Sequence, residues 1–228
     1  MTTPGKYFGF DTSSVQEAAD GSRRTITGPE IGSYVARVNF DLPGNWGVEL
    51  SGDIQGKQFG PIRFRFDMLE KGVDKVPAIG DPAPRSKQLT LRDVKDISEI
   101  DTTNPPNPGM HNMTLAEALD TGKPIVLAFT TPAFCTSRTC GPVTDKVVVP
   151  LFQKYGDRAI FIHIEPYDLN LARTTGQLQP VPAMIEWGLP TEPWVFVIDK
   201  QGRVLGKFEG IMGIDEVEAV LQRAICGC

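Results

Sequence analysis

Residues 134–143 read FCTSRTCGPV and place two thiols, Cys135 and Cys140, between a predicted strand and a predicted helix. The apolar run 125–130 precedes them, and residues 143–155 follow with helical spacing. A helix N-terminus offers unpaired backbone N–H groups and the positive end of the helix dipole, which favour a thiolate over a thiol. The stretch therefore predicts reversible dithiol–disulfide chemistry. A static disulfide or a pair of buried, inert thiols is the structural alternative.

The composition of the chain argues against several other classes of protein. The 228 residues are 40% hydrophobic, which suffices for an ordinary core, and the formal net charge is −5 at pH 7. This charge disfavours a nucleic acid or an anionic membrane as the main partner. No apolar run is long enough for a transmembrane helix, and the first residues lack the basic and apolar regions of a signal peptide.

The N-terminal third is predicted to be a small all-β domain, residues 1–75. Apolar and polar side chains alternate with period two over 34–40, 46–50 and 62–68. Several short strands joined by turns are typical of an antiparallel, immunoglobulin-like sandwich. Residues 76–113 are rich in proline, which interrupts both strand ladders and helices, and we expect them to form a linker.

The remaining residues, 114–228, are predicted to form an α/β domain. A capping-box pattern at 114–117 begins a short helix, and later helices and strands follow from apolar periodicity. The expected elements are helix 115–121, strand 125–130, helix 143–155 kinked at Pro150, strand 158–164, helix 182–187, strands 194–199 and 203–209, and helix 214–225. The first two strands are expected to pair in parallel and the last two as an antiparallel hairpin.

This order, with a dithiol after the first strand, resembles the thioredoxin fold over about residues 114–225. TPAFCTSRTCGP at 131–142, GDPAP at 80–84 and WGLPTEP at 187–193 are similar to landmarks of a bacterial redoxin-type group of two-domain proteins. The resemblance implies thiol-disulfide exchange and a cis-proline, Pro193, beside the dithiol. It also implies a location in the cell envelope, whereas the lack of a leader in this sequence points to the cytoplasm.

The dithiol departs from the usual thioredoxin pattern. Four residues separate the cysteines instead of two, and the run Cys140-Gly-Pro-Val143 carries valine where thioredoxins have their second cysteine. Either Cys135 or Cys140 could therefore be the attacking thiol, and we favour Cys135. The acidic residue that thioredoxins bury beneath the dithiol corresponds to Ala128.

Two charged residues are candidates for assisting the dithiol. Arg138 lies between the cysteines and could stabilise a thiolate, although a solvent-facing arginine is an equal alternative. Glu192 precedes Pro193 and could transfer a proton or contact the substrate. Glu165 and Asp168 follow a predicted strand and are expected to be solvated loop carboxylates.

The chain ends with a second cysteine pair, Cys226 and Cys228. A C-x-C dithiol on a flexible tail could exchange with Cys135 and Cys140 and relay electrons, or the four thiols could bind Zn or Cu(I). A frayed terminus without a role is the third reading.

The two histidines do not suggest a metal site in the sequence. His163 lies within an apolar strand and is expected to be a core histidine, and His111 lies in the predicted linker without an assigned role. A copper-delivery function would require a histidine near Pro193, and none is found in residues 188–193.

We therefore expect a thiol-disulfide oxidoreductase without a dissociable cofactor or metal. Its expected substrate is a protein disulfide or a small thiol, Cys135 attacks, Cys140 resolves, and an external redox partner resets the pair. A thiol peroxidase is the first alternative, although the hydroxyl residue expected three positions before the reactive cysteine is matched only by Ser137 relative to Cys140. A non-catalytic metal-carrying or binding module is the second.

Overall fold

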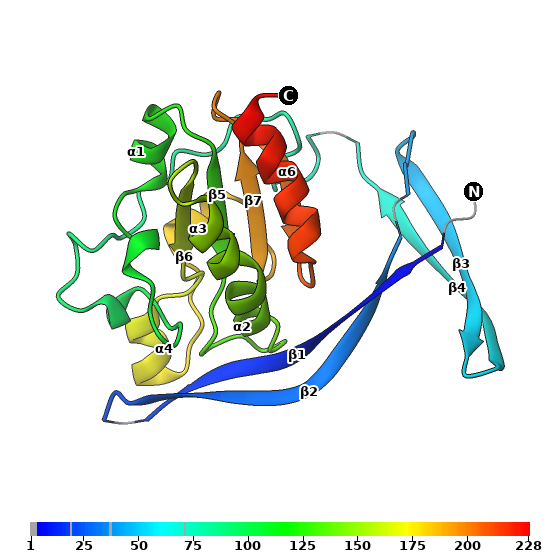
Figure 1. Cartoon of the computed structure of the whole chain (residues 1–228), viewed down its shortest axis with the longest axis horizontal. Helices are drawn as coiled ribbons and strands as arrows, with labels where there is room; N and C mark the ends of the chain where they lie inside the picture. Colours follow the sequence, from blue (N-terminus) through cyan, green and yellow to red (C-terminus); the bar gives the residue numbers. More distant parts are fainter. Residues whose placement is uncertain (1–3, 19, 37, 71) are drawn as a thin grey trace.

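A sheet with the strand order β6-β5-β7-β8 forms the centre of the C-terminal half of the chain (Figure 1). The computed structural model describes residues 4–18, 20–36, 38–70 and 72–228. The strands are β5 (Ile125–Phe129), β6 (Ile160–Ile164), β7 (Trp194–Ile198) and β8 (Val204–Glu209). β5 pairs with β6 in parallel, while β7 is antiparallel to both β5 and β8. A parallel β-α-β unit followed by a β-hairpin and a helix is the topology of the thioredoxin fold, so the fold predicted for residues 114–228 is confirmed.

Helices cover both faces of this sheet, and as a result every residue of β5 and β7 is buried. The helices of the domain are α1 (Leu115–Asp120), α2 (Cys140–Val143), α3 (Val149–Tyr155), α4 (Leu169–Thr175), α5 (Pro182–Glu186) and α6 (Ile214–Cys226). Side chains of α1 and α5 pack on one face with Leu127 and Phe196. Side chains of α2, α3 and α6 pack on the other with Val126 and Val197. Successive strand residues point to opposite faces, which gives the domain two apolar layers.

The helix after the cysteines is interrupted where the sequence predicts a kink. A π-helical turn, η3 (Thr144–Val148), joins α2 to α3, and Pro150 lies in the first turn of α3. Proline has no backbone N–H to donate to the preceding turn, which accounts for the irregular ladder. The helical run begins at Cys140, three residues earlier than predicted, so one thiol lies at its N-terminus.

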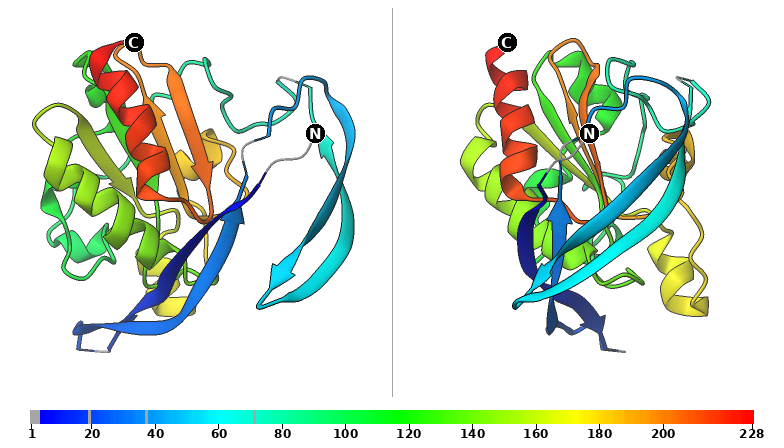
Figure 2. Two further views of the ribbon diagram at one scale, coloured as in Figure 1. Left: turned by 45° about the vertical axis from the view of Figure 1, so that its right-hand side comes forward. Right: turned by 90° about the vertical axis from the view of Figure 1, so that its right-hand side faces the viewer.

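Strands occupy the N-terminal part, as predicted, but the run 34–40 overlaps a strand only at its first two residues, where β2 ends at Val35, and the strands pair as two hairpins. β1 (Lys6–Glu17) pairs with β2 (Arg23–Val35), and β3 (Gly44–Ile54) pairs with β4 (Lys57–Met68), in separate two-stranded sheets of the described residues. Figures 1 and 2 show that the β3/β4 hairpin stands apart from the helices. The strands do not form the packed sheets of a sandwich. Period-two alternation shows which side chains share a face, but it does not show what covers that face.

The proline-rich segment expected as a linker packs against the α/β domain. It contains short 3₁₀ turns, η1 (Ile97–Glu99) and η2 (Pro108–Met110), and its backbone bonds β8 through Gly80 N–H and the Val204 carbonyl at 2.8 Å. Several of its polar side chains are buried: Ser86, Thr90, Asp101, Thr102, Thr103 and His111. The segment therefore contributes a polar layer next to the sheet.

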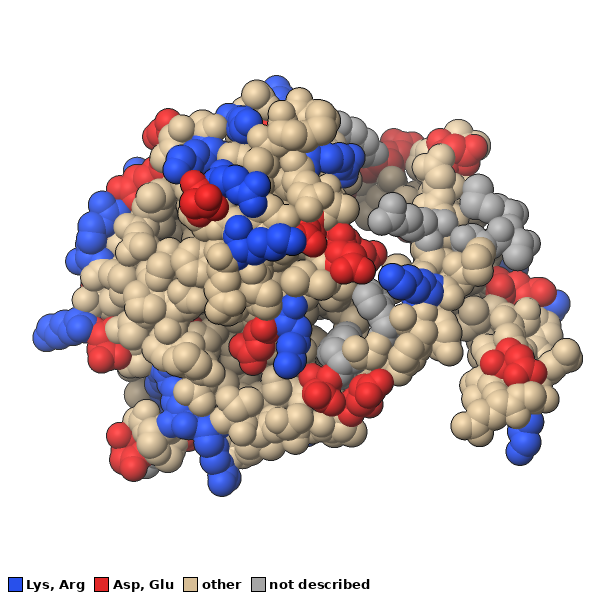
Figure 3. Space-filling model, in the orientation of Figure 1, with Lys and Arg blue, Asp and Glu red and all other residues tan. Residues whose placement is uncertain are grey.

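No helix of the described residues is long and apolar enough to cross a membrane. On the face drawn in Figure 3, acidic and basic side chains are interspersed, and no large area carries one sign of charge.

Candidate active site

The two predicted redox thiols lie together at the end of β5. Cys135 is in the loop that follows the strand, and Cys140 is the first residue of α2. Both are free thiols and both are buried, with 9% of Cys135 and none of Cys140 exposed. Their sulfur atoms and a carboxylate oxygen of Glu192 all lie within 4.8 Å of one another. The fold thus brings together three of the residues singled out in the sequence.

The surroundings of Cys135 stabilise its thiolate. The hydrogen bond from the Cys140 side chain lowers the pKa of Cys135 most. The Ser137 hydroxyl lies 3.1 Å from the Cys135 sulfur, and the Cys140 backbone N–H donates to that sulfur at 3.4 Å. Together these hydrogen bonds outweigh burial and lower the pKa of Cys135 to about 5. The Thr139 hydroxyl is in turn hydrogen-bonded to Ser137 at 2.7 Å, which orients the serine.

The surroundings of Cys140 instead favour its protonated thiol. Burial and the neighbouring Cys135 raise the pKa of the Cys140 thiol well above its ordinary value. At neutral pH the pair therefore consists of one thiolate, at Cys135, and one thiol, at Cys140. The sequence left the attacking cysteine open, and this asymmetry favours Cys135.

A carboxyl group and a phenol lie beside the dithiol. The Glu192–Pro193 peptide bond is cis, and the Tyr167 hydroxyl donates a hydrogen bond to Glu192 Oε2. Burial raises the pKa of Glu192, and the nearby Cys135 raises it further, while the bond from Tyr167 opposes the shift. Burial and Glu192 together raise the pKa of Tyr167. Tyr167 was not among the predicted site residues, because it lies in the loop after β6 and meets Glu192 only through the fold.

Arg138 and Ala128 have no direct part in this arrangement. Arg138 is exposed and has a positive φ of 59°, as the solvent-facing alternative anticipated. Ala128 is fully buried within β5, at the position where thioredoxins carry an acidic residue. The acidic group nearest to the thiols comes instead from Glu192, on the loop before β7.

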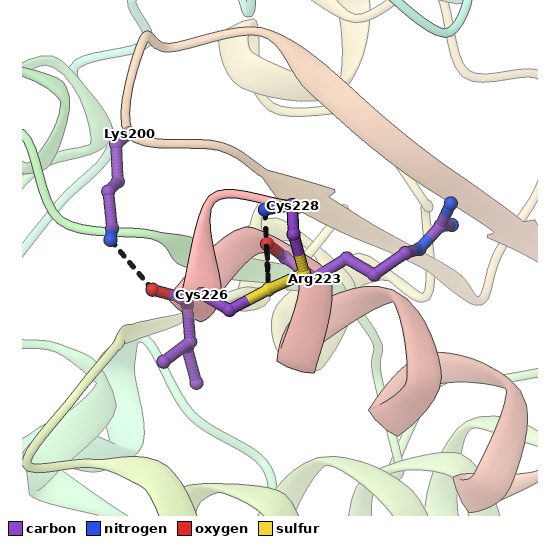
Figure 4. The surroundings of a disulfide bond; sticks show 5 residues. Lys200, Arg223, Cys226 and Cys228 are labelled. Carbon is purple, nitrogen blue, oxygen red and sulfur yellow. Dashed lines mark hydrogen bonds between the residues drawn. A yellow bond between two sulfur atoms is a disulfide. The ribbon is translucent and has the colours of Figure 1, made fainter.

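The C-terminal cysteines lie at the other end of the sheet. Cys226 and Cys228 form a disulfide at the end of α6, and Lys200 donates to the carbonyl of Ile225 at 2.6 Å (Figure 4). Lys200 follows β7, whose last residue pairs with the first residue of β5, whereas Cys135 follows the last residue of β5. The length of β5, roughly 13 Å, therefore separates the two pairs. The fold does not bring the four thiols together for a relay or a shared metal ion within one molecule.

The N-terminal hairpin covers the dithiol loop. The Val15 N–H donates to the Pro132 carbonyl at 3.0 Å, and β1 passes across the start of α2 (Figure 2). A Cβ atom at Gly141 would lie only 2.9 Å from the Ser13 carbonyl oxygen, so this close approach requires glycine. Glu17 pairs with Arg173 of α4 at 2.7 Å and holds the far end of the strand. This contact was not predicted, because residues 1–75 were expected to form a separate domain.

A second polar cluster lies on the other side of the dithiol loop. Asp101, His111 and His163 are buried together, and Glu165 lies two residues beyond His163. The Ala133 N–H donates to the Thr102 hydroxyl at 3.2 Å, and that hydroxyl donates to Glu165 at 2.7 Å. Glu165 is therefore buried instead of being the solvated loop carboxylate expected, and Asp168 caps α4.

Comparisons with known proteins return only distant structural likeness. No protein-family model and no curated protein sequence matches the chain. A thioredoxin-family thiol:disulfide interchange protein from Chlorobium tepidum TLS is 20% identical, with 66% of this chain and 99% of that chain covered and a TM-score of 0.40. A DsbF homologue from Corynebacterium diphtheriae is 18% identical, with 69% and 98% covered and a TM-score of 0.43. At these values the assignment of the fold rests on the strand topology described above.

Proposed function

We propose that this protein is a thiol-disulfide oxidoreductase in which Cys135 attacks and Cys140 resolves. The observation that carries the proposal is the asymmetry of the pair: a thiolate held by the Ser137 hydroxyl and a backbone N–H, beside a buried thiol. With a pKa of about 5, Cys135 is about 99% thiolate at pH 7, and the thiolate is the nucleophile in disulfide exchange.

In the first step the Cys135 sulfur attacks one sulfur of a partner disulfide. A bond forms between Cys135 and that sulfur, the partner disulfide breaks, and the second partner sulfur leaves as a thiolate. Loss of the negative charge at Cys135 removes one of the influences that raise the pKa of Cys140. The first step therefore prepares the second thiol for ionisation.

In the second step Cys140 loses its proton to Glu192 and attacks Cys135. The Cys135–Cys140 disulfide forms, the mixed disulfide breaks, and the partner leaves as a dithiol after taking up protons. Tyr167 orients the Glu192 carboxylate through its hydrogen bond, and Pro193 shapes the adjoining face for the partner's backbone. An external dithiol must then reduce the Cys135–Cys140 disulfide. Because every step is reversible, an external disulfide that oxidises the pair would instead lead to oxidation of the partner.

The proposed partners are protein disulfides or small disulfides. The likeness of the three sequence landmarks to envelope redoxins supports a site of action outside the cytoplasm. A thiol peroxidase would use the same Cys135 thiolate, so peroxide consumption by the reduced protein is the measurement that separates the two activities.

The test is to trap the mixed disulfide. Reduced Cys140→Ser is expected to form a covalent adduct with a model disulfide such as oxidised insulin, detectable by mass, because its Cys135 can attack but cannot be released. Cys135→Ser is expected to form no adduct at neutral pH. An adduct of Cys135→Ser alone would assign the attack to Cys140, and no turnover of any disulfide by the unsubstituted protein would refute the activity.

A further inference from the structure

A buried group of three ligand-type side chains lies outside the dithiol. Asp101 and His111 come from the proline-rich segment on either side of η2, and His163 comes from β6. Their side chains are almost fully buried, with 0%, 1% and 0% exposed. One oxygen and two ring nitrogens all lie within 4.8 Å of one another. The redox mechanism uses none of the three.

The hydrogen bonds of His163 leave one of its nitrogens facing a carboxylate. His163 Nε2 lies 2.9 Å from the carbonyl oxygen of Thr130, which can only accept, so Nε2 carries the proton. In the neutral ring Nδ1 is then an acceptor, and it lies 3.7 Å from Asp101 Oδ1, which is also an acceptor. His163 Nδ1 has no hydrogen-bond partner among the described residues. Asp101 Oδ1 also accepts from the Thr103 N–H at 2.7 Å, so His163 Nδ1 is the buried acceptor that lacks a donor, and a positive group between the two atoms would satisfy it.

A second unsatisfied acceptor lies on the same strand. Glu165 Oε1 accepts hydrogen bonds at 2.7 Å from both the N–H and the hydroxyl of Thr102, whereas Glu165 Oε2 makes no hydrogen bond of ordinary geometry in the described part of the chain and has the Thr131 hydroxyl as its neighbour. His163 and Glu165 are two residues apart on β6 and its continuation, so they share a face of the sheet. Both line a cavity of about 930 Å³, together with His111.

We propose that Asp101, His111 and His163 bind a divalent cation, and that the cation is Zn²⁺. Two imidazoles and a carboxylate are a ligand set that zinc takes in proteins. Ligand atoms about 2.0–2.2 Å from a tetrahedral zinc lie about 3.4 Å apart. Each imidazole faces a different oxygen of Asp101 at close to that separation. His111 Nε2 lies 3.1 Å from Oδ2, to which it donates a hydrogen bond that a metal ion would replace, and His163 Nδ1 lies 3.7 Å from Oδ1.

The hydrogen bonds around the three side chains are also those expected around a metal ion. A histidine that binds metal commonly donates its other N–H to a carbonyl or carboxylate, and Thr130 provides such a carbonyl for His163. His111 and His163 line the cavity, so a small ligand from the cavity can complete the coordination. The bond from Ala133 to Thr102 connects this site to the loop that carries Cys135, so the cation stabilises that loop.

The alternative occupant is a proton on His163 Nδ1, which would donate to Asp101. Titration of the double variant Cys135→Ser/Cys140→Ser separates the two, because that variant contains no free thiol and its remaining cysteines form a disulfide. After treatment with a chelator, the variant is titrated with Co²⁺, followed by the visible absorption of tetrahedral cobalt, and with Zn²⁺ in competition with a chromophoric chelator. The cation proposal predicts one ion per chain.

Two substitutions and one control test whether the ion binds at the proposed ligands. Adding His163→Gln or Asp101→Asn to the double variant is expected to weaken Zn²⁺ binding more than about 100-fold, because a direct ligand is lost. Glu186→Gln, which removes a carboxylate lining the same cavity, is expected to leave the affinity unchanged. Far-UV circular dichroism checks that each variant is folded. An unsubstituted site that binds no ion, or binding that survives both substitutions, would overturn the proposal without affecting the redox function.

Discussion

Replacing Ser137 by alanine tests whether the hydroxyl stabilises the Cys135 thiolate. The serine oxygen lies 3.1 Å from the sulfur, and a hydrogen bond to a charged group is worth about 1.5–3 kcal/mol. Because Ser137 is exposed, the lower end applies, which corresponds to about one pKa unit. The pKa of Cys135 should therefore rise from about 5 to about 6 in Ser137→Ala.

The pH dependence of Cys135 alkylation measures this shift directly. The midpoint of the iodoacetamide rate is expected to move up by about one pH unit, and the loss of thiolate stabilisation should lower the reduction potential at pH 7 by roughly 30 mV. Thr139→Val is the graded control: it removes only the group that orients Ser137 and should cause a smaller shift. An unchanged midpoint and potential in Ser137→Ala would refute this account of the thiolate.

Three further predictions concern the proton acceptor, the hairpin and stability. Glu192→Gln, with Cys140 intact, should slow the resolution of the mixed disulfide by Cys140 at least about 100-fold at pH 7, the loss typical of a general base, and an unchanged stopped-flow rate would argue against its role. Glu17→Gln removes the pairing with Arg173 that holds β1 on α4, together with the pairing with Arg23 within the hairpin. A loss of about 1 kcal/mol should raise the alkylation rate of Cys135 about five-fold, and equal rates would show that β1 does not limit access. The folded-state pKa of Cys135 is about 5, against an ordinary value of 9.0. The free energy of unfolding of the reduced protein, measured in urea relative to Cys135→Ser, should therefore rise between pH 5 and pH 9 and fall again as the pH is lowered. A relative free energy that falls as the pH rises over this range would contradict the prediction.

The thioredoxin-like domain was predictable because its elements are encoded locally. The capping box of Thr114 and Glu117 begins α1 as expected, and the apolar runs that form β5 and β7 are continuous because both faces of these strands are buried. The same locality explains the error at the N-terminus. Period-two alternation indicates a strand but contains no information on its neighbours, so the position of β1 over α2 was not foreseen.

The sequence by itself determined the order of the strands β5 to β8 and of the helices around them except α4, the placement of Cys135 and Cys140 at a strand-helix junction, and the proline that follows Glu192. Only the tertiary structure decided which thiol is ionised, because the pKa depends on hydrogen bonds and burial that arise when the loop closes on α2. It also separated the C-terminal disulfide from the active pair and brought Asp101 and His163 together across more than sixty residues of chain. Local propensities act over a few residues, whereas electrostatic interactions act through space, so the chemistry of the site follows from the fold.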